Sequence, residues 1–532
     1  MLYHKSWQGC PKGFHTLIGL LPLMAVMLMT GCFGENHHKN RNITMEAFSD
    51  MKTPAFVYDF ASVKSQLSEI ALQDVPQTAA DRAVRSYYLE GADHLVWVDR
   101  WGVDSRPDTL LNWLRMVREM GMNERAFYVD AIEPLLQRLR QMDLRANTDV
   151  NQLAAQLEYR LSKACMRYVY GQRFGFMNPH RVFNNLDVED QTDTLQRTVR
   201  YRGLSDMDMD LPSGTYAKQV LCTVSNDSLT ELLHNVQPQD KFYQQLQRML
   251  PTASDDQSRR RILCNMERCR WRLHHPIPDE GKRVVVNIPA YSLYAYGADS
   301  VLQMRVACGA MKTKTPLLTS EMEWMEVNPQ WVIPKSILEK DVAKHAGDSA
   351  YFARNKYDIY EKGTNRQLPV GEVTRSMLMS GKYRVAQQSG SHNSLGRIVF
   401  RFKNKFSVFL HYTSTPGVFQ RDLRAVSHGC VRVAKPFELA EFLLDDPDEW
   451  LLDRIRISMG LKAVTERGQK YLETHPGDED HKLIGYVPVK PRVPLYIIYY
   501  TLWTDENGVL QTWPDVYGYD NVIWNQLKPY VN

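Results

Sequence analysis

The first half of the chain places apolar and polar residues with the period of an amphipathic helix. Apolar residues recur there at steps of three and four, so they share one helical face. One such stripe consists of Val150, Leu153, Leu157 and Leu161, and Asn147, Thr148 and Asp149 are possible N-caps before it. A second stripe consists of Leu135, Leu136, Leu139 and Met142, with Pro134 expected in the first turn of its helix. We therefore predict a helical scaffold domain over residues 56–275.

From about residue 282 the pattern changes to short runs of β-branched and aromatic residues, which are typical of strands. Such runs lie at 284–288, 398–402 and 406–411, and His411 ends the third of them. A helix expected after 459 is followed by another such run at 493–500. We predict a β-rich domain over residues 282–532 and an α+β fold for the chain.

Residues 335–388 interrupt the β-rich domain with polar sequence that also carries Tyr351, Phe352, Tyr357 and Tyr360. An insertion of this length in a compact domain is usually functional or disordered. The aromatic residues argue against disorder, because they need something to pack against. We expect a capping insertion over the functional site, with a small subdomain that only covers a sheet edge as the alternative.

The start of the chain has the features of an export signal. Residues 1–31 combine Lys5 and Lys12 with an apolar stretch over 17–29 that is short for a membrane span. The stretch ends in Met29-Thr30-Gly31-Cys32, which resembles a bacterial lipoprotein processing site. We predict a lipoprotein signal peptide at 1–31, lipidation of Cys32, and a polar tether over 32–55. The alternative is an ordinary cleaved signal. Either signal places the protein in the cell envelope, and lipid on Cys32 anchors it to a membrane facing the periplasm.

Composition and charge exclude some classes of protein. The chain has 532 residues, enough for two or more cores, and a net charge of +4 that argues against a nucleic-acid partner. It has eight cysteines, of which Cys10 lies in the predicted signal, Cys32 at the lipidation site and Cys430 in the motif described next. The five others are an odd number, so this is not a disulfide scaffold.

The run Ser-His-Gly-Cys-Val-Arg at 427–432, with His411 upstream, carries the chemistry of the chain. A thiol, an imidazole that can take its proton, and a flexible backbone that can hold an oxyanion are the parts of nucleophilic acyl transfer. We predict Cys430 as the nucleophile and His411 as the general acid and base. The alternatives are a small buried cysteine, a core histidine, or a metal site formed by His411, His428 and Cys430.

The neighbours of Cys430 have less certain assignments. The N–H groups of Gly429 and Cys430 are the candidate oxyanion donors, and Gly429 also suits a positive φ. His428 either shapes this pocket or only its loop. Arg432 either binds a substrate carboxylate or pairs with an internal one such as Asp422. Ser427 is expected to fix the loop by hydrogen bonds.

One group of residues resembles a zinc site. Cys264, Cys269, His274 and His275 have suitable side chains. However, two cysteines five positions apart on a helix point to different faces, and the histidines come after the expected helix. We expect these residues to be structural and predict no metal.

The motif at 427–432, with His411 before it, resembles the signature of the YkuD-type L,D-transpeptidases, which remodel bacterial peptidoglycan. Further blocks resemble the large YcbB-like branch of this family: 265–268, 270–271, 286–291, 315–316, 328–331 with Pro334, 393–397 and 515–518. The resemblance covers roughly residues 260–525. It implies a YkuD-type catalytic domain beside a helical scaffold, with no cofactor. That branch commonly carries a peptidoglycan-binding module, for which the step from Pro251 to Asn265 leaves no room.

The resemblance also implies substrates and further roles. Cys430 attacks the third residue of a stem tetrapeptide, D-alanine leaves, and an amine of a diamino acid in another stem forms a 3→3 cross-link. The carbonyl of Tyr412 orients His411, and carbapenem-type β-lactams acylate the same thiol. Three alternatives remain open: an L,D-carboxypeptidase with water as acceptor, an enzyme that attaches proteins to peptidoglycan, and a wall-binding scaffold without catalysis.

Overall fold

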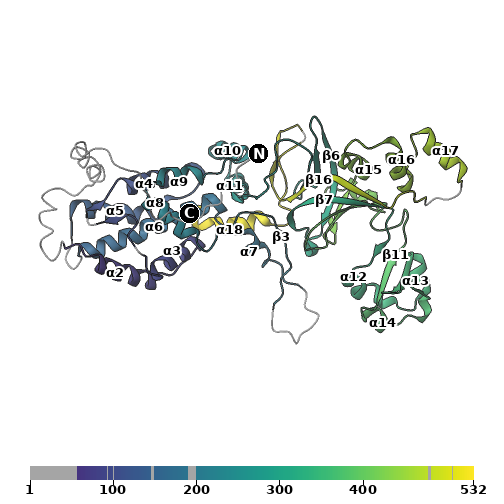
Figure 1. Cartoon of the computed structure of the whole chain (residues 1–532), viewed down its shortest axis with the longest axis horizontal. Coiled ribbons are helices and arrows are strands. Elements are labelled where there is room, and N and C mark those ends of the chain that lie inside the picture. The colour runs from purple at the N-terminus through teal and green to yellow at the C-terminus, as the bar shows by residue number, and fades with distance from the viewer. Residues whose placement is uncertain are drawn as a thin grey trace, which may run out of the picture.

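The computed structural model describes residues 57–92, 94–99, 101–144, 149–189, 199–476, 481–505 and 507–531. The predicted signal peptide, the tether and Cys32 lie outside these residues. Figure 1 shows an elongated molecule with the helical region at one end and the β-rich region at the other. In the described ranges, no helix combines the length and the apolar character that crossing a membrane requires.

Helix α6 forms the centre of the helical region, as its apolar stripe predicts. It runs from Val150 to Phe174 and packs against α2, α3 and α5. The Asp149 side chain accepts a hydrogen bond from the Gln152 N–H at 2.7 Å, which confirms one of the expected N-caps. The helices are α2 (Phe60–Gln73), α3 (Ala79–Leu89), α4 (Arg106–Arg115), α5 (Val129–Gln141), α6, α7 (Pro179–Phe183), α8 (Tyr216–Ser225), α9 (Leu229–Asn235), α10 (Lys241–Met249) and α11 (Asp256–Arg270); a hairpin of β1 (Val98–Asp99) and β2 (Gly102–Val103) follows α3.

Helix α5 begins earlier than the sequence suggests. Pro134 lies inside the helix rather than in its first turn, so that prediction is wrong. Val129 and Ile132 are buried, and their packing extends the helix upstream of the proline.

Two ion pairs of low exposure connect α6 with the preceding helices. Lys163 Nζ lies 2.8 Å from Asp74, the C-cap of α2, and their side chains are 8% and 18% exposed. Arg167 Nη2 lies 2.7 Å from Oδ2 of Asp81 in α3, and these two side chains are more fully buried. Such pairs are costly to break, because the remaining charge stays without a partner.

The β-rich region is one sheet that returns on itself. Its order is β12-β13-β15-β6-β5-β4-β16-β7-β3; β12 also pairs with β7, and β14 pairs with β6. The strands are β3 (Ser205–Asp206), β4 (Arg283–Asn287), β5 (Ser292–Tyr296), β6 (Val301–Gly309), β7 (Leu317–Val327), β12 (Ile398–Phe402), β13 (Leu410–His411), β14 (Ala425–Ser427), β15 (Val431–Val433) and β16 (Tyr486–Ile498). The runs at 284–288 and 398–402 are thus confirmed as strands, whereas only the end of 406–411 is paired.

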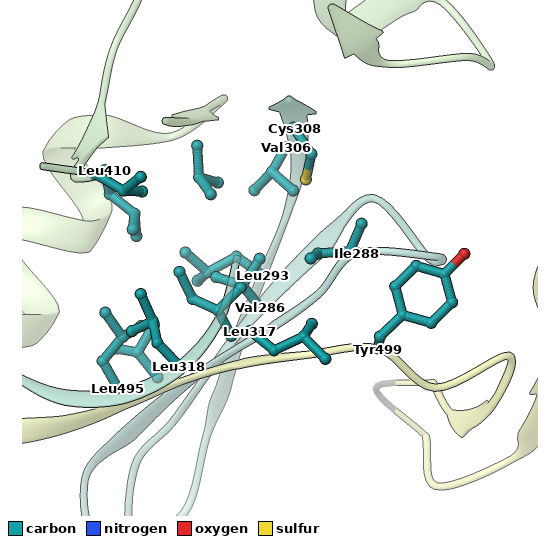
Figure 2. Close-up of a cluster of buried hydrophobic side chains, with 14 of the residues drawn as sticks. Val286, Ile288, Leu293, Val306, Cys308, Leu317, Leu318, Leu410, Leu495 and Tyr499 are labelled. Carbon is teal, nitrogen blue, oxygen red and sulfur yellow. The ribbon is translucent and has the colours of Figure 1, made fainter. Parts of the chain in front are cut away.

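The sheet encloses the main core. Figure 2 shows part of it, with Val286, Leu293, Val306 and Leu410 among the labelled side chains. The core also includes residues of the helical half such as Leu246 and Leu263, so it joins the two regions. Helices α15 (Pro436–Leu443), α16 (Glu449–Ser458) and α17 (Glu466–Thr474) follow β15, and α17 is the helix expected after 459.

Two elements cross between the regions. Strand β3 comes from the helical half and pairs with β7 in the sheet. The last helix, α18 (Tyr519–Val531), follows the hairpin β17 (Leu502–Thr504) and β18 (Leu510–Thr512) and returns to the helices. Figure 1 shows α18 lying among the helices. There the Asn123 N–H donates to the Tyr530 carbonyl at 2.7 Å. The two regions are therefore connected across the expected boundary near 275–282. Strand β3 extends from the helical region into the sheet, and α18 returns from the β-rich region to the helices.

The insertion forms a subdomain with its own sheet and core. Strands β8 (Trp331–Val332), β9 (Tyr357–Glu361), β10 (Gln367–Leu368) and β11 (Tyr383–Gln387) form the sheet, in the order β10-β9-β11-β8. Helices α12 (Lys335–Lys340), α13 (Ser349–Arg354) and α14 (Arg375–Met379) surround a core that includes the fully buried Phe352. Figure 1 shows this subdomain as a separate lobe beside the main sheet. Its aromatic residues are ordered, as expected, and the capping role stays a prediction.

Candidate active site

Strand pairing brings the segments that carry the predicted nucleophile and base together in the sheet. Strands β13 and β15 are parallel, with Leu410 opposite Val431 and His411 opposite Arg432. Leu410 and Val431 are buried in the main core. Because side chains alternate along a strand, His411 and Arg432 face the other way. Cys430 lies immediately before β15, and the charges of Arg401 and Arg432 act on both its thiol and the His411 imidazole, so the two side chains, nineteen positions apart in the sequence, share one environment.

The turn before Cys430 depends on glycine and on Ser427. Gly429 has φ +121°, a conformation that other residues adopt only with strain. A Cβ there would lie no closer than 3.8 Å to its nearest neighbours, so backbone conformation rather than space requires the glycine. Ser427 Oγ accepts from the Gly429 N–H at 3.1 Å and donates to the Cys430 carbonyl at 2.5 Å. The structure therefore gives Ser427 the loop-fixing bonds that the sequence predicts.

The two candidate oxyanion donors differ. The Gly429 N–H is occupied by Ser427, as described. The Cys430 N–H makes no hydrogen bond to any residue that the structure describes. It is the better placed of the two to receive a developing negative charge next to the thiol.

A clip formed by residues 309–315 supports the loop, and the sequence analysis did not identify it as a functional element. Thr313 Oγ1 donates to the Ser427 carbonyl at 2.7 Å, and Thr315 Oγ1 donates to the Gly429 carbonyl at 2.8 Å. The Tyr517 hydroxyl closes the clip by donating to the Gly309 carbonyl at 2.6 Å. Thr315 and Tyr517 lie in blocks that resemble the family, but nothing local in the sequence assigns them this role.

Burial keeps the Cys430 thiol largely protonated. The half-buried environment raises the pKa of Cys430 to about 11, against the opposing effects of a Phe409 backbone hydrogen bond and the charges of Arg401 and Arg432. At pH 7 only about one molecule in 10⁴ then carries a thiolate. A base close to the thiol is therefore needed for attack.

His411 is buried and neutral. It is 5% exposed, and burial, with the charge of Arg432, lowers its pKa to about 3, although the backbones of Tyr412 and Leu395 oppose this shift. Its Nδ1 makes no hydrogen bond with the described residues. The Tyr412 backbone interacts with the ring, and its role in orienting His411 stays a prediction. The Phe409 ring contacts the imidazole edge to face at 5.7 Å between centroids.

Two arginines give this face positive charge. Arg432 is half-buried, its Nε is buried without a hydrogen-bond partner in the described residues, and it forms no ion pair there with Asp422. Arg401 lies over the Phe409 ring at 4.4 Å and pairs with Glu326 through two hydrogen bonds of 3.2 and 3.0 Å. An unpaired guanidinium beside the thiol favours the interpretation that Arg432 binds a substrate carboxylate.

His428 and the residues of the possible zinc site complete the set that the sequence predicted. His428 is exposed and has no hydrogen bond to a described residue, so its part in the oxyanion pocket stays a prediction. Cys264 donates to the Asp520 carbonyl at 3.3 Å, and burial raises the pKa of both Cys264 and Cys269. His274 instead contacts Asp208 and Asp210 at 2.7 and 3.0 Å. In the described ranges, no three side chains of metal-ligating type come together.

Comparisons with known proteins identify the domains in which this site lies. Residues 281–473 match the model of the YkuD L,D-transpeptidase catalytic domain, and residues 82–250 match that of a scaffold domain. A Haemophilus influenzae protein named "Putative L,D-transpeptidase" is 28% identical over 332 residues, which are 60% of this chain and 62% of that protein. The chain thus spans less than two thirds of the curated relative. His411 and Cys430 both fall within the catalytic match.

Proposed function

The chain contains the catalytic domain of the YkuD-type L,D-transpeptidase family together with a scaffold domain, and from this premise we propose that it cross-links peptidoglycan stem peptides through an acyl-enzyme on Cys430. The observation that carries the proposal is the pairing of β13 with β15, which brings His411 and the segment of Cys430 together beside the charges of Arg401 and Arg432. The unpaired Arg432 beside them suits the carboxylates of a stem peptide.

The first half-reaction forms a thioester. His411 takes the thiol proton as Cys430 Sγ attacks the carbonyl of the third residue of a tetrapeptide stem. The negative charge on the carbonyl oxygen is held by the Cys430 N–H. The C–N bond to the terminal D-alanine then breaks, and the leaving amine takes the proton from His411. The neutral imidazole that burial favours is the form needed at the start of this step.

The second half-reaction transfers the acyl group. An amine on the third residue of another stem, a diamino acid such as diaminopimelate, attacks the thioester and loses a proton to His411. The C–S bond breaks, and the thiolate recovers that proton. One amide is broken and one is formed, so the 3→3 link needs no external energy source. The thiol of Cys430 is regenerated.

We expect the purified mature protein to convert tetrapeptide-bearing peptidoglycan into 3→3 dimers with release of D-alanine. Muropeptide mass analysis measures this, with the Cys430→Ala protein as the blank. If tripeptide stems form without dimers, the protein is an L,D-carboxypeptidase and not a transpeptidase. Stems left intact by folded protein would overturn the proposal, and transfer to an added protein amine alone would favour the attachment enzyme.

We also propose that Cys32 carries the membrane anchor and that the catalytic domain acts on the periplasmic side. The proposal rests on the sequence at 29–32, which resembles a lipoprotein processing site. Two or more acyl chains hold a protein stably at a membrane, so lipid on Cys32 is a sufficient anchor. We expect Cys32→Ser to appear in the soluble fraction or to keep its signal peptide, while the unchanged protein stays with membranes. Release of the unchanged protein from membranes without detergent would contradict the anchor.

A further inference from the structure

An ion pair joins the scaffold match to the clip behind the catalytic loop. Lys314 lies between Thr313 and Thr315, and its Nζ contacts both carboxylate oxygens of Asp187 at 2.6 Å. The two side chains are 7% and 22% exposed. Asp187 belongs to residues 82–250, and Lys314 belongs to residues 281–473, so this contact connects the two matched domains.

The scaffold side of this contact is itself well supported. The Asp187 carbonyl accepts from the Arg202 N–H at 2.8 Å, and the Arg202 guanidinium donates to the Lys312 carbonyl. A few residues further, the Leu317 N–H donates to the Leu204 carbonyl at 2.9 Å, where β3 joins β7. The scaffold therefore holds the clip at Lys312 and Lys314, and the strand that follows it at Leu317.

The clip has little freedom to relax around these contacts. A Cβ on Gly309 would lie 2.0 Å from the Thr313 carbonyl oxygen. The backbone at Gly309 therefore packs so closely against Thr313 that only glycine fits. The Gly309 N–H donates to Thr315 Oγ1 at 2.8 Å, and that hydroxyl in turn holds the Gly429 carbonyl. A shift of Lys314 therefore moves both threonine hydroxyls that support the catalytic loop.

We propose that Asp187 and Lys314 are positioning residues, through which the scaffold domain sets the geometry of the Cys430 loop for acyl transfer. The inference rests on the proposed function of Cys430. Residues 313–315 hold the carbonyls of Ser427 and Gly429, and these peptide units set the direction of the Cys430 N–H. Acylation needs that N–H in place, whereas simple alkylation of the thiol does not.

The test replaces the ion pair and a matched one remote from the site. Lys314→Met and Asp187→Asn remove the positioning pair. Lys163→Met and Asp74→Asn remove the Lys163–Asp74 pair of the scaffold, which has the same residue types and similar exposure. Lys314→Arg keeps the charge and is the conservative variant. For each protein, Tm, kcat and KM for transfer, and the rate of Cys430 alkylation by iodoacetamide are measured.

We expect Lys314→Met and Asp187→Asn to lower kcat by about 10- to 100-fold, since small displacements of reacting groups have effects of this size. KM and alkylation should change little, and Lys314→Arg should recover most of kcat. The Lys163 and Asp74 variants should lower Tm to a similar degree with kcat nearly unchanged. Equal losses of kcat in both pairs, or normal kcat in folded Lys314→Met, would overturn the inference.

Amide hydrogen exchange separates this inference from the proposed function. Exchange of the peptide covering 425–433 should be faster in Lys314→Met than in Lys163→Met, measured far below the Tm of both proteins. If the unchanged protein transfers no stem peptide, the proposed function fails, and this comparison still decides the coupling. Equal exchange in the two variants would contradict the coupling whatever the activity.

Discussion

Cys430→Ala is expected to abolish release of D-alanine and formation of 3→3 dimers, with a loss of at least about 10⁴-fold, while the protein still folds. The substitution removes the atom that forms the thioester. Neither the imidazole of His411 nor the guanidinium of Arg432 can replace a thiolate as the nucleophile. It removes little volume at a half-buried position, so the core around Val431 stays packed. Muropeptide analysis and thermal unfolding measure the two expectations.

Cys308 provides the matched control for this substitution. It lies in β6, is fully buried in the main core, and burial raises its pKa to about 12. Cys308→Ala should retain transfer with a modest loss of stability. A carbapenem-type β-lactam is expected to add its mass to the unchanged protein and to Cys308→Ala but not to Cys430→Ala. Transfer at the normal rate by folded Cys430→Ala would remove the thiol from the mechanism.

His411→Ala is expected to slow acylation by about 10²–10⁴-fold, the usual worth of a general base. Because burial leaves the thiol with a pKa of about 11, the variant must rely on the small thiolate fraction present at neutral pH. That fraction grows about tenfold per pH unit below the pKa. The residual rate of the variant should therefore rise steeply from pH 7 to 10, and stopped-time mass spectrometry of the acyl-enzyme measures it.

Two further variants show whether a slow His411→Ala protein has lost its base or only its packing. His411→Gln fills more of the buried site than alanine does but supplies no base, so it should stay slow even where the packing recovers. His428→Ala changes an exposed imidazole near the same thiol and should retain most of the rate. A slow His428→Ala beside a near-normal His411→Ala would move the base to His428.

The sequence indicated the chemistry and the fold class through local patterns. The helical period of 150–161 and the β-branched runs at 284–288 and 398–402 predicted elements that the structure contains. The expectation that Pro134 lies in the first turn of its helix was wrong, because burial of Val129 and Ile132 extends α5 upstream. This packing has no local signature in the sequence. The motif at 427–432 indicated a nucleophilic thiol and its loop. The motif lies within residues 281–473, which match the model of the catalytic domain.

Only the tertiary structure decided how the site is held together. The pairing of β13 with β15 brings His411 and the segment of Cys430 together, and pairing depends on which distant segments pack against each other. The occupation of the Gly429 N–H by Ser427 and the support of the loop by Thr313, Thr315 and Tyr517 appear only when these segments meet.

By itself, the sequence determined the α+β class and indicated the residues that we propose for acyl transfer, because these properties depend on side chains a few positions apart. The tertiary structure decided the low pKa of His411, the unpaired state of Arg432 and the contact of Asp187 with Lys314, 127 positions away. Burial and charge pairing arise from surroundings that the folded chain assembles from remote segments, and no local pattern encodes them.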